Sequence, residues 1–206
     1  MGKIKVLVAD DHAIVRTGLV SLLGHAGDIE IVGEAGNGEA AVSKALKLAP
    51  DVVVMDLMMP KKDGIGATAE IREKLPGTKV LILTSFGTSE EIARAFAAGA
   101  TGAVLKNAAN SELVSAVRRV AAGKRTVSRE VENMLDNDPP VQDLSPRQRE
   151  ILESFTRGLT NGQIALLLDI SPESVKTHIA KLFEKIGAAN RSEAVSIALR
   201  KHLLKL

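Results

Sequence analysis

Five short apolar runs, rich in β-branched residues, recur through the first 120 residues and constrain the fold of this 206-residue chain most strongly. Nearly continuous apolar runs of this kind are typical of strands that are buried on both faces of a parallel sheet. Amphipathic stretches with helical periodicity lie between them. The alternation predicts five β–α units in a doubly wound α/β domain with a five-stranded parallel sheet. The runs are 4–9, 29–33, 52–55, 80–83 and 103–105, and the helical stretches are 12–23, 38–48, 65–74, 89–97 and 110–122.

Composition excludes several classes of protein. The chain has no cysteine, which rules out disulfides, zinc–thiolate sites, iron–sulfur clusters and thiol catalysis. It has no Trp or Tyr and only four Phe, so the core is aliphatic and aromatic platforms for single-stranded nucleic acid are excluded. No apolar run approaches the roughly 20 residues that span a bilayer. The first apolar run is also too short for a signal peptide, so we expect a cytoplasmic protein.

The pattern changes after residue 123. The acidic run 136–138 and the pair Pro139-Pro140 indicate an extended linker, with a short helix expected over 128–135. From 144 on the β-branched runs vanish and four helices are expected, near 146–157, 161–168, 172–186 and 190–204. Short turns between them predict a helix-turn-helix unit. The predicted organisation is an α/β domain over 1–123, a linker over 124–143 and an all-α four-helix domain over 144–206.

Charge is divided between these parts. Residues 144–206 carry ten basic and six acidic residues, a net charge of +4, whereas 1–143 carry 17 basic and 19 acidic residues, a net charge of −2. Two interpretations stay open on charge alone: ordinary scatter, or a polyanion as the partner of the C-terminal domain.

Polar residues stand where four of the predicted strands end. Asp10 and Asp11 follow the first strand, Asp56 the third, Thr84 the fourth and Lys106 the fifth. The carboxyl ends of parallel strands meet at one edge of a sheet, so these side chains should converge. Three converging carboxylates repel one another unless a cation lies among them, and hard oxygen ligands suit Mg²⁺. The local alternatives are that Asp11 only caps the first helix and that Lys106 is a solvated surface lysine.

This set, together with Pro60 and Gly64 after Asp56, resembles the receiver domain of two-component response regulators over residues 3 to about 122. The resemblance implies a flavodoxin-like fold and a phosphoryl acceptor at Asp56. It also implies a Mg²⁺ ion held by Asp11, Asp56 and the backbone carbonyl of Met58, with Asp10 contributing through water. Lys106 and Thr84 would each contact a phosphoryl oxygen.

Two departures bear on this resemblance. Receivers commonly carry an aromatic residue three positions before the lysine, where this chain has Ala103, so the signal must be relayed in another way. Met58 and Phe86 are apolar and flank the expected path of attacking water, which predicts slow hydrolysis of the aspartyl phosphate.

The C-terminal part resembles the LuxR-type helix-turn-helix domain of the NarL/FixJ subfamily over about 144–203, most specifically at 174–178. In such a unit the second helix enters the major groove of DNA. Val175, Ile179, Leu182 and Ile186 fall at helical spacing and predict its buried stripe. The expected DNA contacts are Thr160, Asn161, Ser174, Lys176, Thr177 and Lys181. The alternative is that the two lysines only form a solvated face.

The resemblance implies a transcription regulator rather than an enzyme. A histidine kinase would phosphorylate Asp56, and the protein would bind double-stranded DNA as a homodimer. A regulator that binds DNA without phosphorylation and uses its receiver as a dimerisation scaffold is the first alternative. A Mg²⁺-dependent phosphatase is the second, although it leaves the helix-turn-helix half unexplained.

Overall fold

The computed structural model describes residues 2–85, 88–141, 144–201 and 203–204. The chain forms two compact units, Met1–Asp138 and Pro139–Leu206, which are described separately.

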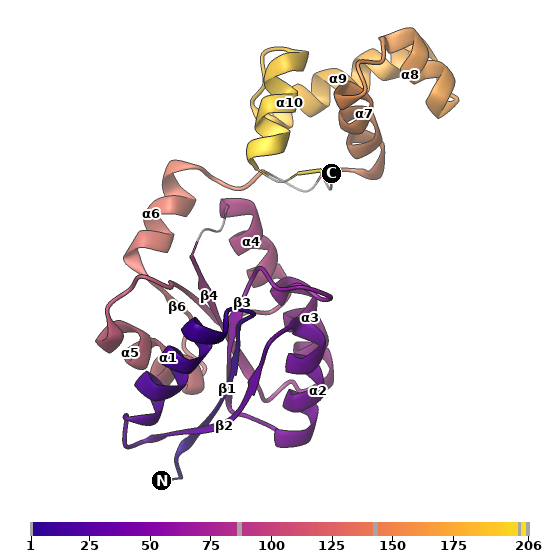
Figure 1. Cartoon of the computed structure of the whole chain (residues 1–206). Helices are drawn as coiled ribbons and strands as arrows, with labels where there is room; N and C mark the ends of the chain where they lie inside the picture. Colours follow the sequence, from indigo (N-terminus) through magenta and orange to yellow (C-terminus); the bar gives the residue numbers. More distant parts are fainter. Residues whose placement is uncertain (1, 86–87, 142–143, 202, 205–206) are drawn as a thin grey trace. The chain divides into compact units, whose positions relative to one another are not determined.

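The first unit is built on a parallel sheet, drawn from indigo through magenta to salmon in Figure 1. Its strand order is β2-β1-β3-β4-β5-β6 among the described residues, and every pair is parallel. The order reverses at β1, as in other doubly wound sheets, and ligands bind at such a point beyond the carboxyl ends of the strands. The strands are β1 (Ile4–Ala9), β2 (Ile29–Ala35), β3 (Val52–Asp56), β4 (Lys79–Thr84), β5 (Gly102–Leu105) and β6 (Thr126–Val127).

Helices cover both faces of this sheet, because alternate strand residues enter two separate apolar clusters. Leu7 and Val53 belong to the cluster that α2, α3, α4 and α6 complete, whereas Val6 and Val54 belong to the cluster under α1 and α5. Both clusters are almost wholly aliphatic, as the composition predicts. The helices are α1 (Ala13–Gly24), α2 (Gly38–Leu48), α3 (Gly64–Lys74), α4 (Ser89–Ala97), α5 (Asn110–Ala121) and α6 (Arg129–Asn137).

The structure differs from the expectation in the segment after residue 123. The five predicted strands are present, but a sixth, β6, pairs with β5 through Gly102–Thr126 and Ala103–Val127. Helix α6 follows, with the Ser128 side chain accepting the Val131 N–H at its start. Val131 is fully buried in the sheet cluster. Residues 124–138 of the expected linker therefore fall in the first unit. A two-residue strand is too short for a period-two pattern to reveal it.

The second unit contains four described helices, as predicted: α7 (Pro146–Thr156), α8 (Asn161–Leu168), α9 (Pro172–Ile186) and α10 (Arg191–Arg200). Each begins with a capping side chain, on Ser145, Thr160, Ser171 and Asn190 respectively. Such caps satisfy N–H groups that the first turn of a helix leaves unpaired. Gly187 has a φ of 72°, a left-handed conformation that suits glycine, and so ends α9.

The four helices enclose a third apolar cluster that includes Ile151, Ile164, Val175 and Leu182. Phe155 and Phe183 meet edge to face there, with ring centroids 6.0 Å apart. No helix within the described ranges is both long and apolar enough to cross a bilayer.

Candidate functional site

Asp56 ends β3, and its side chain lies at the carboxyl edge of the sheet with 4% of the residue exposed. The loop that follows returns close to the strand, because the Gly64 N–H donates to the Leu57 carbonyl at 2.8 Å. A Cβ at Gly64 would lie 2.0 Å from the Asp56 carbonyl oxygen, so glycine is required at this point. The close return buries the backbone of Asp56 and leaves its carboxylate at the sheet edge.

Lys106 lies between two carboxylates of this edge. Its Nζ is 2.8 Å from Asp56 Oδ2 and 2.6 Å from Asp10 Oδ2. The lysine side chain is only 11% exposed, which excludes the alternative of a solvated surface lysine. Its backbone is fixed as well, since the Lys106 N–H donates to the Thr84 carbonyl at 2.8 Å.

Burial and charge act in opposite directions on this pair. Burial raises the pKa of the Asp56 carboxyl, and the hydrogen bond from Lys106 only partly opposes that effect. Burial also disfavours the charged form of Lys106, but its hydrogen bonds to Asp10 and Asp56 outweigh burial and raise the pKa of the lysine. The ammonium group is therefore a fixed positive charge beside Asp56.

Four side chains at this edge form a group that could hold a metal ion: Asp10, Asp11, His12 and Asp56, each with a ligand atom within 4.8 Å of the others. The three carboxylates and Lys106 together carry a net charge of −2, which one divalent cation neutralises. A site of carboxylate oxygens at one open edge fits Mg²⁺, which takes few protein ligands and keeps several waters. Asp11 is not the helix cap, because the N-cap of α1 is His12.

The sequence interpretation missed two residues near this group. His12, which the sequence pattern does not single out, has its Nδ1 2.8 Å from Asp11 Oδ1. In the sequence, its position directly after Asp10 and Asp11 is the feature that could have identified it as a member of the group. Arg16, one turn into α1, donates from Nη1 to the Asp10 carbonyl at 2.7 Å and pairs with Glu34 at 3.3 Å. It ties the β1–α1 loop to β2, and no sequence pattern marks it.

The remaining candidates of the first unit lie around the same edge. Thr84 ends β4 and is 1% exposed. Met58 follows Asp56 by two positions, has 58% of its surface exposed, and makes a backbone hydrogen bond to the Asp56 carboxylate. Phe86 lies outside the described residues.

In the second unit, the candidate DNA-contacting residues lie on α8 and α9. Thr160 is the N-cap of α8 and Asn161 is the first residue of that helix; both are exposed. Helix α9 begins 11 residues after the first residue of α8, and a three-residue turn separates the two helices. This is the spacing of a helix-turn-helix. The candidates on α9 are Ser174, Lys176, Thr177 and Lys181, of which Ser174 is half-buried and the others are exposed.

Helix α9 has one buried face and one charged face. Val175, Leu182 and Ile186 are buried and Ile179 is half-buried, which confirms the predicted stripe. On the other face Lys176 lies 3.4 Å from Glu173, with both side chains mostly exposed. The side chain of Glu150 pairs with Arg147 at 2.9 Å on α7.

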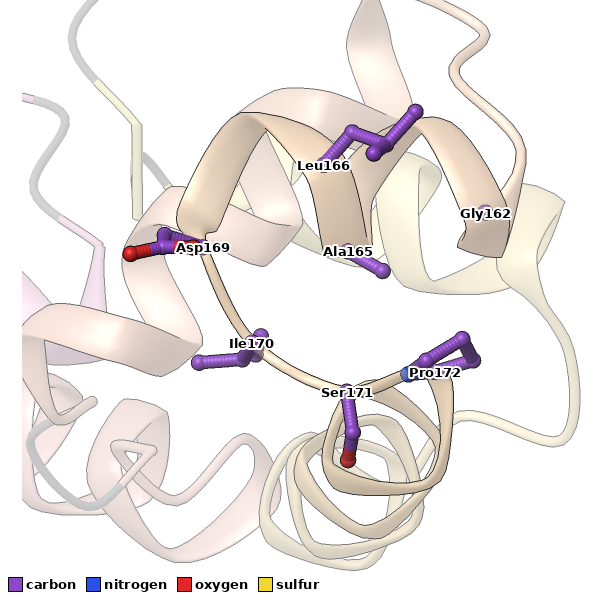
Figure 2. A pocket seen from close by; sticks show the side chains of 7 residues that line it. All are labelled: Gly162, Ala165, Leu166, Asp169, Ile170, Ser171 and Pro172. Carbon is purple, nitrogen blue, oxygen red and sulfur yellow. The ribbon is translucent and has the colours of Figure 1, made fainter.

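A shallow hollow of about 420 Å³ lies at the turn between α8 and α9. Figure 2 shows Leu166 of α8 on one side of it, and on the other Ser171 of the turn and Pro172, the first residue of α9. Leu166 is 85% exposed. The hollow therefore lies between α8 and the start of α9, where the helix-turn-helix is open to solvent.

Comparisons with known proteins agree with both halves of this description. Residues 6–118 match the profile of the response regulator receiver domain, and 142–198 match that of bacterial regulatory proteins of the luxR family. The response regulator protein VraR of Staphylococcus aureus is 37% identical over 207 residues, which cover 98% of this chain and 99% of that protein.

Two solved structures extend the likeness to the whole chain. The response regulator ChrA of a heme-sensing two-component system has 41% identity and a TM-score of 0.60, covering 99% of this chain and 100% of that one. The response regulator RcsB in complex with DNA has 26% identity and a TM-score of 0.72, covering 97% of this chain and 99% of that one. These matches identify a family of transcription regulators rather than enzymes. The chain therefore belongs to the response regulators that join a receiver domain to a LuxR-type helix-turn-helix domain, the NarL/FixJ group.

Proposed function

We propose that this protein is a DNA-binding transcription regulator of a two-component system that is switched by phosphorylation of Asp56. The donor is the phosphohistidine of a partner histidine kinase. The observation that carries the proposal is the Asp56 carboxylate, which lies at the carboxyl edge of β3 with the Lys106 ammonium 2.8 Å away, in a chain that also has a helix-turn-helix. We assign phosphoryl acceptance to the unit Met1–Asp138 and DNA binding to the unit Pro139–Leu206. Transcription control of this kind takes place in the cytoplasm.

Phosphoryl transfer needs a nucleophile in line with the bond that breaks and fixed charge around the transferred group. The Asp56 carboxylate attacks phosphorus, the O–P bond forms, and the N–P bond to the kinase histidine breaks. Lys106 already points its ammonium at the attacking carboxylate, so a positive charge is in place for a phosphoryl oxygen. We assign a second phosphoryl oxygen to the Thr84 hydroxyl.

When bound, Mg²⁺ would supply a doubly positive charge that stabilises the negative charge of the transferred group. We assign its ligands to Asp11, Asp56 and the backbone carbonyl of Met58, with Asp10 acting through water. The grouping of the carboxylates within 4.8 Å and their uncompensated charge support this assignment. His12, whose Nδ1 lies 2.8 Å from Asp11 Oδ1, would orient that carboxylate.

On the DNA side, we assign Lys181 and Thr177 of α9 to the major groove and Lys176 to the groove edge or backbone. Ser174, at the start of α9, and Thr160 and Asn161, at the start of α8, are assigned to phosphate contacts. The protein would bind as a homodimer whose half-sites lie about 10 bp apart. A coupling of about 1–3 kcal/mol between the two units changes DNA affinity about five- to 150-fold.

The test measures DNA affinity with and without Mg²⁺ and a small phosphodonor, and follows phosphorylation by intact mass. We expect one phosphoryl group per chain and tighter binding. Asp56→Asn should lose both effects, whereas Asp136→Asn, an exposed aspartate on α6, should retain both.

Two results would contradict the proposal. Phosphorylation without a change in affinity would favour a receiver that acts only as a scaffold. Multiple turnover of a small phosphoester without any effect on DNA binding would favour a phosphatase.

A further inference from the structure

Ala103 stands where receivers commonly carry an aromatic residue, and the structure shows what occupies the space around it. Ala103 is fully buried in the apolar cluster that also contains Ile92 of α4 and Val131 of α6. Its carbonyl accepts the Ser128 N–H at 3.0 Å, and Ser128 is the N-cap of α6. The β6–α6 segment, residues 126–137, therefore covers the face of β5 that an aromatic side chain would otherwise fill.

The neighbouring residue on β5 shows that this covering depends on small side chains. A Cβ at Gly102 would lie 2.5 Å from the Thr126 carbonyl oxygen. Gly102 is thus necessary for β6 to pair with β5. Two consecutive small residues on β5 make room for the β6–α6 segment.

The aromatic side chain of this face comes from α4 instead. The ring of Phe96 packs against the same cluster, and the Arg125 guanidinium lies over it, 4.6 Å from the ring centroid. Arg125 is the residue immediately before β6. A cation–π contact therefore joins α4 to the point where the chain enters the β6–α6 segment.

We propose that the β6–α6 segment is the output element of the receiver unit, and that the Arg125–Phe96 contact holds it in place in the unphosphorylated protein. This inference rests on the proposed phosphorylation of Asp56. Phosphorylation weakens the contact and loosens α6 against α4 while β6 stays paired with β5, and the second unit, whose chain follows α6, then binds DNA more tightly.

The elements that hold the segment lead directly from the phosphoryl site. Lys106 follows β5, Thr84 ends β4, and α4 is the next helix after β4. In this structure Lys106 pairs with the unmodified Asp56. A phosphoryl group adds about −1.5 to −2 charges at that point and gives both Lys106 and Thr84 a new partner. A movement of Lys106 shifts the end of β5. A movement of Thr84 shifts the end of β4 and, through the loop after it, α4. The β6–α6 segment packs on β5 and α4.

The test compares Arg125→Gln with Lys124→Gln, an adjacent exposed residue that loses the same charge. Hydrogen exchange of the α6 amides is measured in the full chain with and without beryllofluoride and Mg²⁺. In the wild type and in the Lys124 variant, beryllofluoride should accelerate exchange in α6. In Arg125→Gln, exchange should already be fast, and DNA affinity without phosphodonor should rise about two- to fivefold, the factor that an exposed cation–π contact supplies.

Phe96→Leu provides a second route to the same result, because it removes the ring and keeps an apolar side chain. Its effect on basal DNA affinity should match that of Arg125→Gln, and the double variant should show no further gain. If Arg125→Gln and Lys124→Gln give the same α6 exchange and the same basal affinity, the inference is wrong. This comparison needs no phosphorylation, so its failure is separate from a failure to phosphorylate Asp56.

Discussion

Replacing Lys106 with methionine should destabilise the receiver unit and make its stability depend strongly on Mg²⁺. Lys106 pairs with two carboxylates, at 2.6 Å and 2.8 Å, whose side chains are 1% and 5% exposed. Removing one partner of a buried ion pair costs about 3–5 kcal/mol, because the remaining charge stays desolvated. The sheet edge opens toward the exposed Asp11, so we expect a loss of about 3 kcal/mol in the absence of Mg²⁺.

Calorimetry is the appropriate assay, because the chain has no Trp or Tyr to report unfolding by fluorescence. A loss of about 3 kcal/mol corresponds to a fall of about 10 °C in the Tm of a unit of this size. Lys74→Met is the matched control, since Lys74 is 47% exposed and forms a surface pair with Glu70. Surface pairs contribute about 0–1 kcal/mol, so its Tm should change little.

Mg²⁺ and pH give the prediction two further readouts. Removing the ammonium removes its repulsion of the metal, so Mg²⁺ should bind Lys106→Met more tightly and recover more stability than in the wild type. Burial raises the folded-state pKa of Asp56, and a carboxyl with a raised pKa gains relative stability as the pH falls. The loss in Lys106→Met should therefore shrink toward acidic pH. A loss below about 1 kcal/mol, or one that Mg²⁺ leaves unchanged, would refute the reasoning.

Four further variants test other parts of the structure. Gly64→Ala should cost at least about 2 kcal/mol and slow phosphorylation, because its Cβ would lie 2.0 Å from the Asp56 carbonyl oxygen; a wild-type Tm would contradict this. Thr160→Ala should cost about 1 kcal/mol by calorimetry, since it removes the N-cap of α8, and an unchanged Tm would count against that role. Lys176→Ala should weaken DNA binding on all sequences alike and lower the salt slope by about one, since Lys176 is assigned to the groove edge or backbone, whereas Lys181→Ala, at a residue assigned to the major groove, should chiefly relax sequence preference; equal slopes in salt titrations of both variants would remove this distinction.

The fold was predictable where strong local signals exist. Continuous apolar runs mark the five central strands, and capping residues such as Ser145 and Thr160 mark helix starts to within a residue. The convergence of Asp10, Asp56 and Lys106 followed from the rule that parallel strands end at one edge. It required no knowledge of side-chain contacts.

The parts that were not predictable depend on contacts between distant segments. Strand β6 exists because β5 offers it a free edge, and its two residues carry no pattern of their own. Arg16 reaches the Asp10 carbonyl only because α1 packs beside β2, which no spacing reveals. Helix α6 is amphipathic by sequence, but its partner surface around Ala103 appears only when the sheet is assembled.

The pairing of β6 with β5 also determines at which residue the chain can be truncated to give an isolated receiver unit. Without residues after 123, the backbone donors and acceptors on the outer side of β5 would face solvent, beside an apolar surface that Val131 normally covers. Unprotected edges of this kind pair with other chains and promote aggregation. An isolated receiver that ends at residue 123 should therefore self-associate through β5, whereas one that extends to Asp138 should stay soluble.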